Sequence, residues 1–246
     1  MHLVGKILAA LLAMLYPQRC SSCATIIEEE EGFCSHCFAH IQPITPPFCS
    51  CCGIPFATQE GPDHLCGQCL REPSPFRQAR AWAYYQYGAG DVQPLSTAIQ
   101  KFKYNRDLSI GKALAQLAAA FYPFTSEQYD VIIPVPLHLE RLRWRGFNQA
   151  LLLSKAIGGV HNVAVNPFLL ERIRPTVPQT QLTGKERRTN VQGAFIISSP
   201  DQVRDKRVVL VDDVYTSGAT VSECAQTLTQ AGAHLVDVFT LARAVS

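Results

Sequence analysis

Four Cys-x-x-Cys pairs within the first 69 residues are the feature that most constrains how this 246-residue chain can fold. Two residues between cysteines allow a tight turn to aim both sulfurs at one point, and two such turns supply four thiolates for a tetrahedral zinc ion. The gaps between paired turns, 24–33 and 53–65, are each long enough for one hairpin. We therefore predict two structural zinc sites, with the ligands Cys20, Cys23, Cys34, Cys37, Cys49, Cys52, Cys66 and Cys69.

The spacing leaves the pairing of the four turns open. Sequential pairing, first with second and third with fourth, is the preferred arrangement, but an interleaved pairing also fits. Disulfides and a redox Cys-x-x-Cys are competing interpretations. Disulfides call for an export signal that we do not recognise, and a redox motif would be a single pair in a βαβ pattern. Cys51 is then left over, and His36, His40 and His64 are interpreted as surface residues.

Charge divides the chain at the same place as cysteine content. Residues 1–75 hold three Lys and Arg against seven Asp and Glu, a net charge of −4, and the remainder holds 19 against 13, a net charge of +6. The near-neutral total of +2 excludes a uniformly basic nucleic-acid-binding protein. A basic body suits an anionic ligand. With Pro73-Ser74-Pro75 as the boundary, we predict a zinc head at 1–75 and a body at 76–246.

An apolar run, Ile7–Leu15, precedes the cysteines. It is too short for a membrane span, which needs about 20 apolar residues. It also lacks a cleavage site, and Arg19 just before Cys20 does not suit a lipoprotein signal. We interpret it as a helix packed on the protein surface, with peripheral association at the inner membrane as the alternative. We therefore predict a protein without a transmembrane segment. We also predict that it is cytoplasmic, where thiols stay reduced.

The body alternates apolar runs typical of buried strands with longer segments typical of helices. We predict strands at 80–87, 129–135, 208–211 and 235–241, and helices at 94–104, 107–121, 148–157 and 220–231. Gly158-Gly159 is expected to end the helix at 148–157. This alternation predicts an α/β domain with a doubly wound parallel sheet, preceded by the small zinc head.

The most informative segment of the body joins the strand at 208–211 to the helix after it. The strand runs into Asp212 and Asp213, and a loop of small hydroxyl residues then opens the helix. Such a loop offers N–H groups and hydroxyls to a phosphate, and the helix dipole adds to them. The carboxylates accept hydroxyl groups and can help hold a Mg²⁺ bound largely by substrate phosphates. The predicted phosphate-binding residues here are Val214, Tyr215, Thr216, Ser217, Gly218, Ala219 and Thr220.

This segment resembles the phosphoribosyl pyrophosphate (PRPP) motif of type I phosphoribosyltransferases. Two further blocks are Ile133–His138 leading to Arg141 and Arg145-Gly-Phe-Asn-Gln149, and then Gln179, Leu182, Arg187, Asn190 and Gly193-Ala-Phe195. With the cysteine pairs, this order resembles the ComF family, in particular its GntX-like, DNA-utilisation branch. Members of that family are linked to natural competence and the use of imported DNA. The resemblance covers nearly the whole chain.

The resemblance implies a type I phosphoribosyltransferase-like fold and assigns roles to residues. Asp212 and Asp213 would hold the ribose hydroxyls, and residues 216–220 would grip the 5′-phosphate. A mobile loop within 172–195 would close over PRPP, with Arg187 as a catalytic residue and Asn190 beside it. The remaining PRPP-binding residues implied are Pro136, Leu137, His138, Arg141, Arg145 and Lys103. The alternative for the arginines is a solvated basic face with Trp144 packed inward.

Two functional hypotheses follow. The first is a Mg²⁺-dependent phosphoribosyltransferase that binds PRPP or a related ribose phosphate and transfers the ribosyl group to an acceptor that the sequence does not name. The second is a non-catalytic protein of the DNA-uptake machinery. Its basic loops, with Trp144 and Phe147, would bind single-stranded DNA, and its zinc head would dock uptake or helicase proteins.

Overall fold

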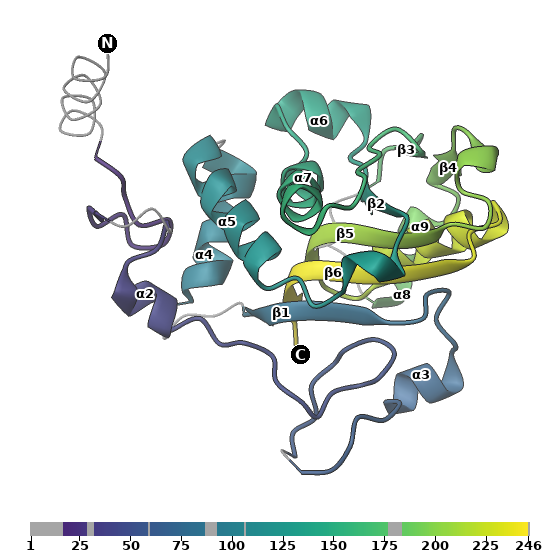
Figure 1. The fold of residues 1–246 in the computed structure, drawn as a ribbon, viewed down its shortest axis with the longest axis horizontal. Coiled ribbons are helices and arrows are strands. Elements are labelled where there is room, and N and C mark those ends of the chain that lie inside the picture. Colours follow the sequence, from purple (N-terminus) through teal and green to yellow (C-terminus); the bar gives the residue numbers. More distant parts are fainter. Residues whose placement is uncertain are drawn as a thin grey trace.

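The computed structural model describes residues 17–28, 32–58, 60–86, 93–105, 107–176 and 184–245. The predicted helix at Ile7–Leu15 and the side chain of Arg187 lie outside this description. None of the described helices is both long and apolar enough to cross a membrane. The elements in chain order (Figure 1) are α2 (Ser35–Ala39), α3 (Gly67–Arg71), β1 (Ala79–Tyr85), α4 (Pro94–Asn105), α5 (Leu108–Ala120), η1 (Ser126–Gln128), β2 (Val131–Pro134), α6 (Leu139–Arg145), α7 (Gln149–His161), β3 (Leu170–Arg172), α8 (Gly184–Val191), β4 (Phe195–Ile197), η3 (Pro200–Gln202), β5 (Arg207–Tyr215), α9 (Ala219–Gln230) and β6 (Leu235–Ala244).

Four parallel strands form the central sheet in the order β1-β6-β5-β2. The side chains of β5 alternate between two cores. Val209 and Val211 belong to the core that contains α4, α5 and α7, whereas Val208 and Leu210 belong to the core that contains α9 and the antiparallel β3–β4 pair. A strand buried on both faces needs a continuous apolar run. The doubly wound parallel sheet predicted from the sequence is therefore confirmed.

The structure extends two predicted strands and adds helices to the body that the sequence pattern did not reveal. β6 runs on to Ala244, and β5 continues beyond Val211 to Tyr215, so Asp212 and Asp213 are strand residues rather than loop residues. One of the added helices, α6, follows β2 and carries Arg141 and Arg145, and the other is α8. The alternating arginines and apolar residues of α6 give no clear helical periodicity over one short segment, which explains why the pattern did not identify it.

The helix predicted at 148–157 does not end at its glycine pair. α7 runs through Gly158 and Gly159 to His161, and Asn162 then adopts the left-handed conformation with φ 55°. A Cβ at Gly158 would lie 2.5 Å from Val165 Cγ2. Glycine at 158 therefore permits close packing of α7 on the following segment, and asparagine supplies the left-handed end.

The described part of the zinc head packs directly on the body (Figure 1). At the edge of β1, Ile44 N–H donates to the Trp82 carbonyl at 2.8 Å and Tyr84 N–H donates to the Gln42 carbonyl at 3.0 Å. At the first cysteine turn, Lys101 Nζ of α4 donates to the Ser22 carbonyl at 2.5 Å. Cys20 of this turn and Cys37 of the next turn share a core with α5. The division of the chain into domains at residue 75 stays a prediction.

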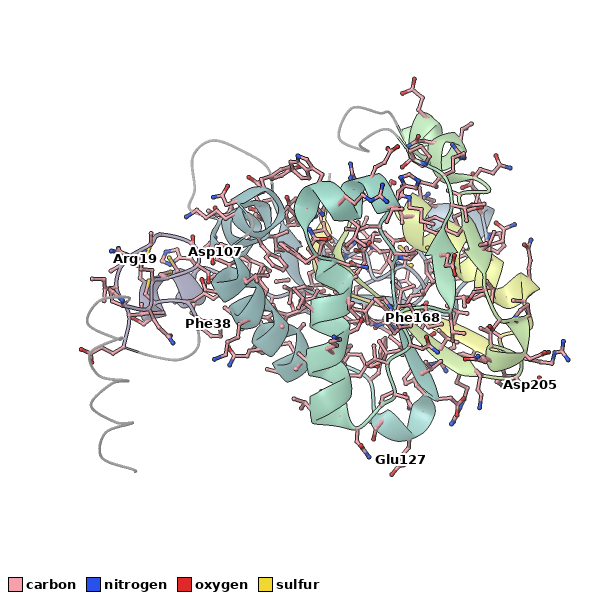
Figure 2. All side chains as sticks on the ribbon, turned by 90° about the horizontal axis from the view of Figure 1, so that it is seen from above. Arg19, Phe38, Asp107, Glu127, Phe168 and Asp205 are labelled. Carbon is pink, nitrogen blue, oxygen red and sulfur yellow. The ribbon has the colours of Figure 1, made fainter. Side chains whose placement is uncertain are left out.

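The first two cysteine turns and the turn before β5 lie at opposite ends of the molecule. Figure 2 shows Arg19 and Phe38 beside the start of α5, which follows Asp107, and Asp205 at the far end of the body. The described residues around the first two cysteine turns therefore cover the α4–α5 side.

One buried carboxylate joins three segments of the body. Asp237 of β6 is fully buried and accepts hydrogen bonds from Arg77 (Nη2, 2.5 Å), the Tyr129 hydroxyl (2.6 Å) and Gln78 (backbone N, 3.2 Å). Burial and the hydrogen bond to Asp237 raise the pKa of Tyr129, so its phenol stays protonated and keeps donating. A charge in the core is tolerated because these donors surround it.

We expect Asp237→Ala to lower the free energy of unfolding by about 3 kcal/mol, because Tyr129 and Gln78 lose a buried acceptor. Urea denaturation at neutral pH measures this loss. The control is Asp201→Ala, which removes an exposed ion pair with Arg204 and should change stability little. Equal losses in the two variants would contradict the role given to Asp237.

Candidate functional site

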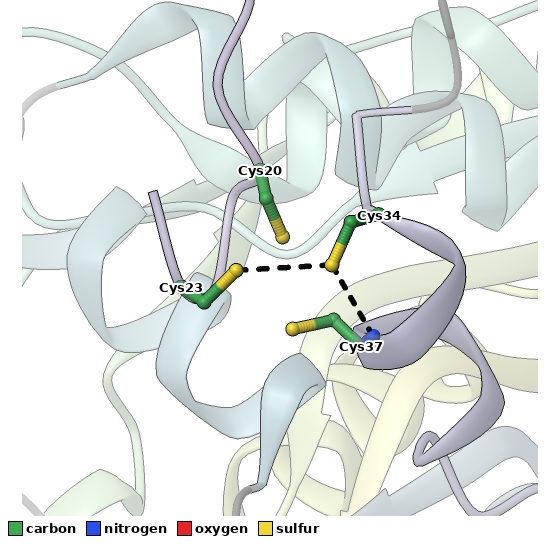
Figure 3. Close-up of side chains that lie close together, drawn as sticks. All are labelled: Cys20, Cys23, Cys34 and Cys37. Atoms are coloured by element: carbon green, nitrogen blue, oxygen red, sulfur yellow. Dashed lines mark hydrogen bonds between the residues drawn. The ribbon is translucent and has the colours of Figure 1, made fainter. Parts of the chain in front are cut away.

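Cys20, Cys23, Cys34 and Cys37 converge on one point (Figure 3). Cys23 Sγ and Cys34 Sγ lie 3.7 Å apart, and Cys37 N–H donates to Cys34 Sγ at 3.4 Å. Tetrahedral zinc with Zn–S bonds of about 2.3 Å separates its sulfurs by about 3.8 Å. This set therefore fits a zinc ion, and it joins the first Cys-x-x-Cys turn to the second.

Cys49, Cys52, Cys66 and Cys69 form the second set, so the sequential pairing is confirmed. Cys52 Sγ lies 3.8 Å from Cys66 Sγ. Burial raises the pKa of Cys49, but N–H donors from Cys66 (3.3 Å) and Cys52 (3.4 Å) outweigh burial and help lower this pKa to about 6. These donors favour the thiolate that zinc binds. Four thiolates close each coordination sphere, which indicates structural zinc.

The other cysteines and the histidines of the head lie outside both sets. Cys51 packs against the residues just before β1. Cys224 is a residue of α9, and its side chain is buried in the core that this helix covers. His36 and His40 contact each other, and His64 stacks on a neighbouring phenylalanine at 4.0 Å. The zinc sets therefore need no histidine ligand.

The acidic pair lies at the carboxyl end of β5, where open parallel sheets bind ligands. Lys103 Nζ, from the last turn of α4, is 2.9 Å from Asp213 Oδ2. Asp212 accepts the backbone N–H of Asp213 at 2.8 Å. Phe102, next to Lys103, is buried and stacks on Phe147 at 4.6 Å, which fixes this turn. Three predicted site residues are thus brought together from distant parts of the chain.

Two largely buried arginines add positive charge near this pair. Burial lowers the pKa of Arg145, the last residue of α6, and the charges of Asp213 and Asp212 oppose this shift. Burial likewise lowers the pKa of Arg172 in β3, and the charge of Asp212 opposes it. Neither Nε atom has a hydrogen-bond partner among the described residues. Desolvated guanidinium groups with unused donors are suited to bind an anion.

Arg172 is a candidate site residue that the sequence does not single out. Within 172–195, the family resemblance points to Arg187 and Asn190 instead. The carbonyl of Asn190 accepts a hydrogen bond from Arg174 at 3.1 Å. Arg172 ends a strand of three residues, which is too short to give a sequence signal.

Residues Arg145–Gln149 join α6 to α7 and form one side of the candidate site. Gly146, with φ 87°, ends α6 in the left-handed conformation. Asn148 begins α7 by accepting the Ala150 N–H at 3.0 Å, and its side chain also donates to the Val135 carbonyl at 3.1 Å. Arg145 is buried and Trp144 is half exposed, so the alternative with Trp144 packed inward is wrong.

The segment after β2 follows the edge of β5. Val135 N–H donates to the Val211 carbonyl at 2.9 Å. Pro136 and Leu137 are half-buried, and the His138 side chain accepts the Glu140 N–H to cap α6. Among the PRPP-binding residues that the resemblance implies, these three form the connection from β2 to α6. Arg141 is half-buried on α6, one turn before Arg145.

The predicted phosphate loop joins β5 to α9. Gly218, with φ 77°, occupies the N-cap of α9 without a side-chain cap, so the first turn of a 12-residue helix offers its N–H groups. Ser217 Oγ accepts one of them, from Ala219, at 3.4 Å. Val214 and Tyr215 are buried in the two cores on opposite faces of the sheet. Their side chains therefore do not line the surface of the loop, which residues 216–220 form.

Comparisons relate the whole chain to known proteins. Residues 11–70 match the family described as a double zinc ribbon domain. The chain is 32% identical to competence protein F of Haemophilus influenzae over 233 residues, which cover 92% of this chain and 97% of that protein. It is 33% identical to the DNA utilization protein YhgH of Salmonella typhimurium, covering 86% of this chain and 90% of that protein. It is 26% identical to competence protein ComFC of Bacillus subtilis, covering 89% and 87%.

Among solved structures, the purine phosphoribosyltransferase of Pyrococcus horikoshii shares 19% identity at a TM-score of 0.31, covering 55% of this chain and 87% of that chain. These values are low, so the description of the fold rests on the strand order of the chain itself.

We expect the purified protein to hold two zinc ions per chain and Cys66→Ser to hold one, because three thiolates no longer close the second site. Thermal unfolding of Cys66→Ser should occur at lower temperature, since metal binding supplies folding free energy. Metal analysis measures the first effect. Cys51→Ser, one residue from a ligand, is the control and should retain both ions. Loss of zinc from the control as well would contradict the assignment.

Burial, together with the adjacent Asp213 carboxylate, raises the pKa of Asp212 from 3.8 to about 7. Between these pH values the folded chain holds a proton that the unfolded chain has released, so stability falls as pH rises through this window. We expect Asp212→Asn to remove this loss, so that its stability relative to wild type increases up to about pH 7 and is then constant. Urea denaturation across this range measures the difference. A pH-independent difference would argue against the raised pKa.

Proposed function

The chain belongs to the family of competence protein F, and from this premise we propose that its body is a phosphoribosyltransferase-type domain that supports the uptake and use of DNA. Its ligand would be PRPP or a related ribose phosphate, bound with Mg²⁺. The cysteine sets would hold structural zinc in the head. We place the protein in the cytoplasm, where its thiols stay reduced.

One arrangement carries this proposal. An acidic pair, with Lys103 beside it and two largely buried arginines near it, stands directly before a glycine-containing loop at a helix N-terminus. Carboxylates that accept ribose hydroxyls and N–H groups that bind a phosphate are thus a few residues apart. Phosphorylated ribose carries both kinds of group.

Each group has a role in the proposed chemistry. Asp212 and Asp213 accept the ribose hydroxyls, residues 216–220 bind the 5′-phosphate, and Arg145 and Arg172 face the pyrophosphate. Mg²⁺, bound to the pyrophosphate oxygens, would supply further charge neutralisation. Because Lys103 already pairs with Asp213, the acidic pair suits hydroxyl groups better than a second cation. Arg187 stays in the proposal as the catalytic residue of the segment that closes over PRPP.

Transfer of the ribosyl group would break the bond from C1 to pyrophosphate and form a bond from C1 to the acceptor. The transition state at C1 is cation-like, so positioning of the ligand and balance of the departing negative charge account for the catalysis. No covalent nucleophile is required from the chain.

A second candidate function is the binding of single-stranded DNA, and an exposed aromatic pair favours it. Trp144 of α6 and Tyr104 of α4 are both exposed, with ring centroids 6.3 Å apart. They lie in sequence beside Arg143, which is exposed, and Lys103. Aromatic rings next to cations are suited to stack on bases and contact phosphates. The zinc head, with exposed Ile26 and Leu70, would then dock uptake proteins.

We expect isothermal calorimetry to detect PRPP binding by the wild type with Mg²⁺, and we expect the double variant Asp212→Asn/Asp213→Asn to weaken it at least about tenfold, because two hydroxyl acceptors are lost. The control is Asp130→Asn. This carboxylate pairs with Arg207 at the amino ends of β2 and β5, far from the acidic pair at the carboxyl end of β5. The control should bind as the wild type does.

No heat with the wild type would refute the proposal, and so would equal affinity of the double variant. DNA binding that falls with salt, persists in the double variant and is lost on replacing Trp144 and Arg143 would instead identify the second candidate.

A further inference from the structure

A buried arginine connects the second cysteine set to the sheet. Arg243 of β6 donates from Nη1 to the Cys52 carbonyl at 2.7 Å, and its Nη2 lies 3.8 Å from Cys52 Sγ. Its exposed fraction is 6%. One side chain of the body therefore contacts both the backbone and the sulfur of a zinc ligand. When that sulfur is a zinc-bound thiolate, the contact is a charge-assisted hydrogen bond.

The same guanidinium lies over the ring of a residue of the predicted phosphate-binding set. Arg243 Cζ is 4.1 Å from the centroid of the Tyr215 ring, and the two residues are register partners on neighbouring strands. Tyr215 is buried, and burial raises its pKa to about 12, so its hydroxyl is present at neutral pH. The stack joins the zinc ligand to the last residue of β5.

The Tyr215 hydroxyl in turn supports the loop. A Cβ at Gly218 would lie 2.3 Å from Tyr215 Oη, so the hydroxyl and the Gly218 backbone are in close contact. Gly218 is the N-cap of α9. A continuous series of contacts therefore runs from Cys52 through Arg243 and Tyr215 to the phosphate loop.

The chemistry of the guanidinium group explains why position 243 is an arginine. A guanidinium donates hydrogen bonds within its plane and stacks on an aromatic ring with its face, so it makes both contacts at once. A lysine ammonium could keep the charge but would lose the stack and one of the two contacts to Cys52.

A second arginine gives a matched comparison. Arg80 of β1 also ties the second ribbon to the sheet: its Nη1 donates to the Ser50 carbonyl at 3.1 Å, and its Cζ lies 4.8 Å from the Phe48 ring centroid. Among the described residues, no hydrogen bond or ring contact joins Arg80 to Tyr215 or to a zinc ligand. Loss of either arginine would therefore loosen the second ribbon. Of the two, only Arg243 contacts Tyr215 and, through it, the loop 216–220.

We infer that Arg243 is a positioning residue that couples zinc at the second cysteine set to the loop 216–220, through Cys52 on one side and Tyr215 on the other. This inference rests on the proposed function for the identity of the ligand, ribose phosphate. The coupling itself is a property of the chain without ligand.

The experiment compares wild type, Arg243→Lys and Arg80→Lys, each as the full chain with both zinc ions. The rate of zinc release to a chelator reports on the metal site, and hydrogen exchange of the Ser222 amide, which donates to the Gly218 carbonyl, reports on the loop. For Arg243→Lys we expect one of the two zinc ions to leave about tenfold faster, together with faster exchange at Ser222. For Arg80→Lys we expect wild-type exchange at Ser222.

Titration with PRPP and Mg²⁺ gives a further readout. Arg243→Lys should bind about tenfold more weakly, Arg80→Lys should bind as wild type does, and saturating PRPP should raise the affinity of the wild type for one of its two zinc ions, because coupling between binding free energies is reciprocal. If the wild type binds no PRPP, the proposed function fails, while zinc release and exchange still decide the coupling.

Equal effects of the two lysine variants on exchange at Ser222 would overturn the inference, and so would no effect of either. Should Arg243→Lys fail to fold, Tyr215→Phe removes only the hydroxyl beneath Gly218. We expect this variant to keep the zinc-release rate of the wild type and to exchange faster at Ser222. Unchanged exchange in Tyr215→Phe would likewise overturn the inference.

Discussion

Burial of β5 on both faces is the constraint on which the rest of the site depends. Because the two cores cover the strand completely, Asp212 and Asp213 emerge from it into a poorly solvated edge of the sheet. Adjacent carboxylates in such surroundings need cations nearby. The fold supplies them from three separate elements, with Lys103 on α4, Arg145 on α6 and Arg172 on β3. The same cations give the site its suitability for a phosphorylated ligand.

The zinc ribbons and the body depend on each other for packing. A small metal-bound segment has too few apolar residues for a core of its own, so metal binding supplies much of its folding free energy. Here the first ribbon also buries Phe33 in the core around α5, and Lys101 binds its turn. The second ribbon is held by Arg80 and Arg243 from neighbouring strands. Each ribbon therefore packs directly on the body, the first against α4 and α5 and the second against β1 and β6.

Local chemistry explains which parts of the site were predictable. Cysteine spacing identifies both metal sets because two residues between sulfurs restrict the turn that holds them. The acidic pair and the loop around Gly218 are identifiable because strand, loop and helix start follow one another in sequence. Arg172 and Arg243 carry no such signal, since each acts through residues far away in the chain. Gly158 was misread as a helix end because only its neighbours show that it permits close packing.

Residues close together in the chain specify the eight metal-binding cysteines, the alternation of strands and helices, and the position of the predicted phosphate loop, so the amino-acid order was enough to identify them. Tertiary structure alone decided the sequential pairing of the cysteine turns, the inward turn of Arg145 with Trp144 left exposed, and the contact of Lys103 with Asp213. It also decided that Tyr215 supports the loop from below. Each of these depends on which distant side chains share one desolvated space, and spacing along a chain does not specify that.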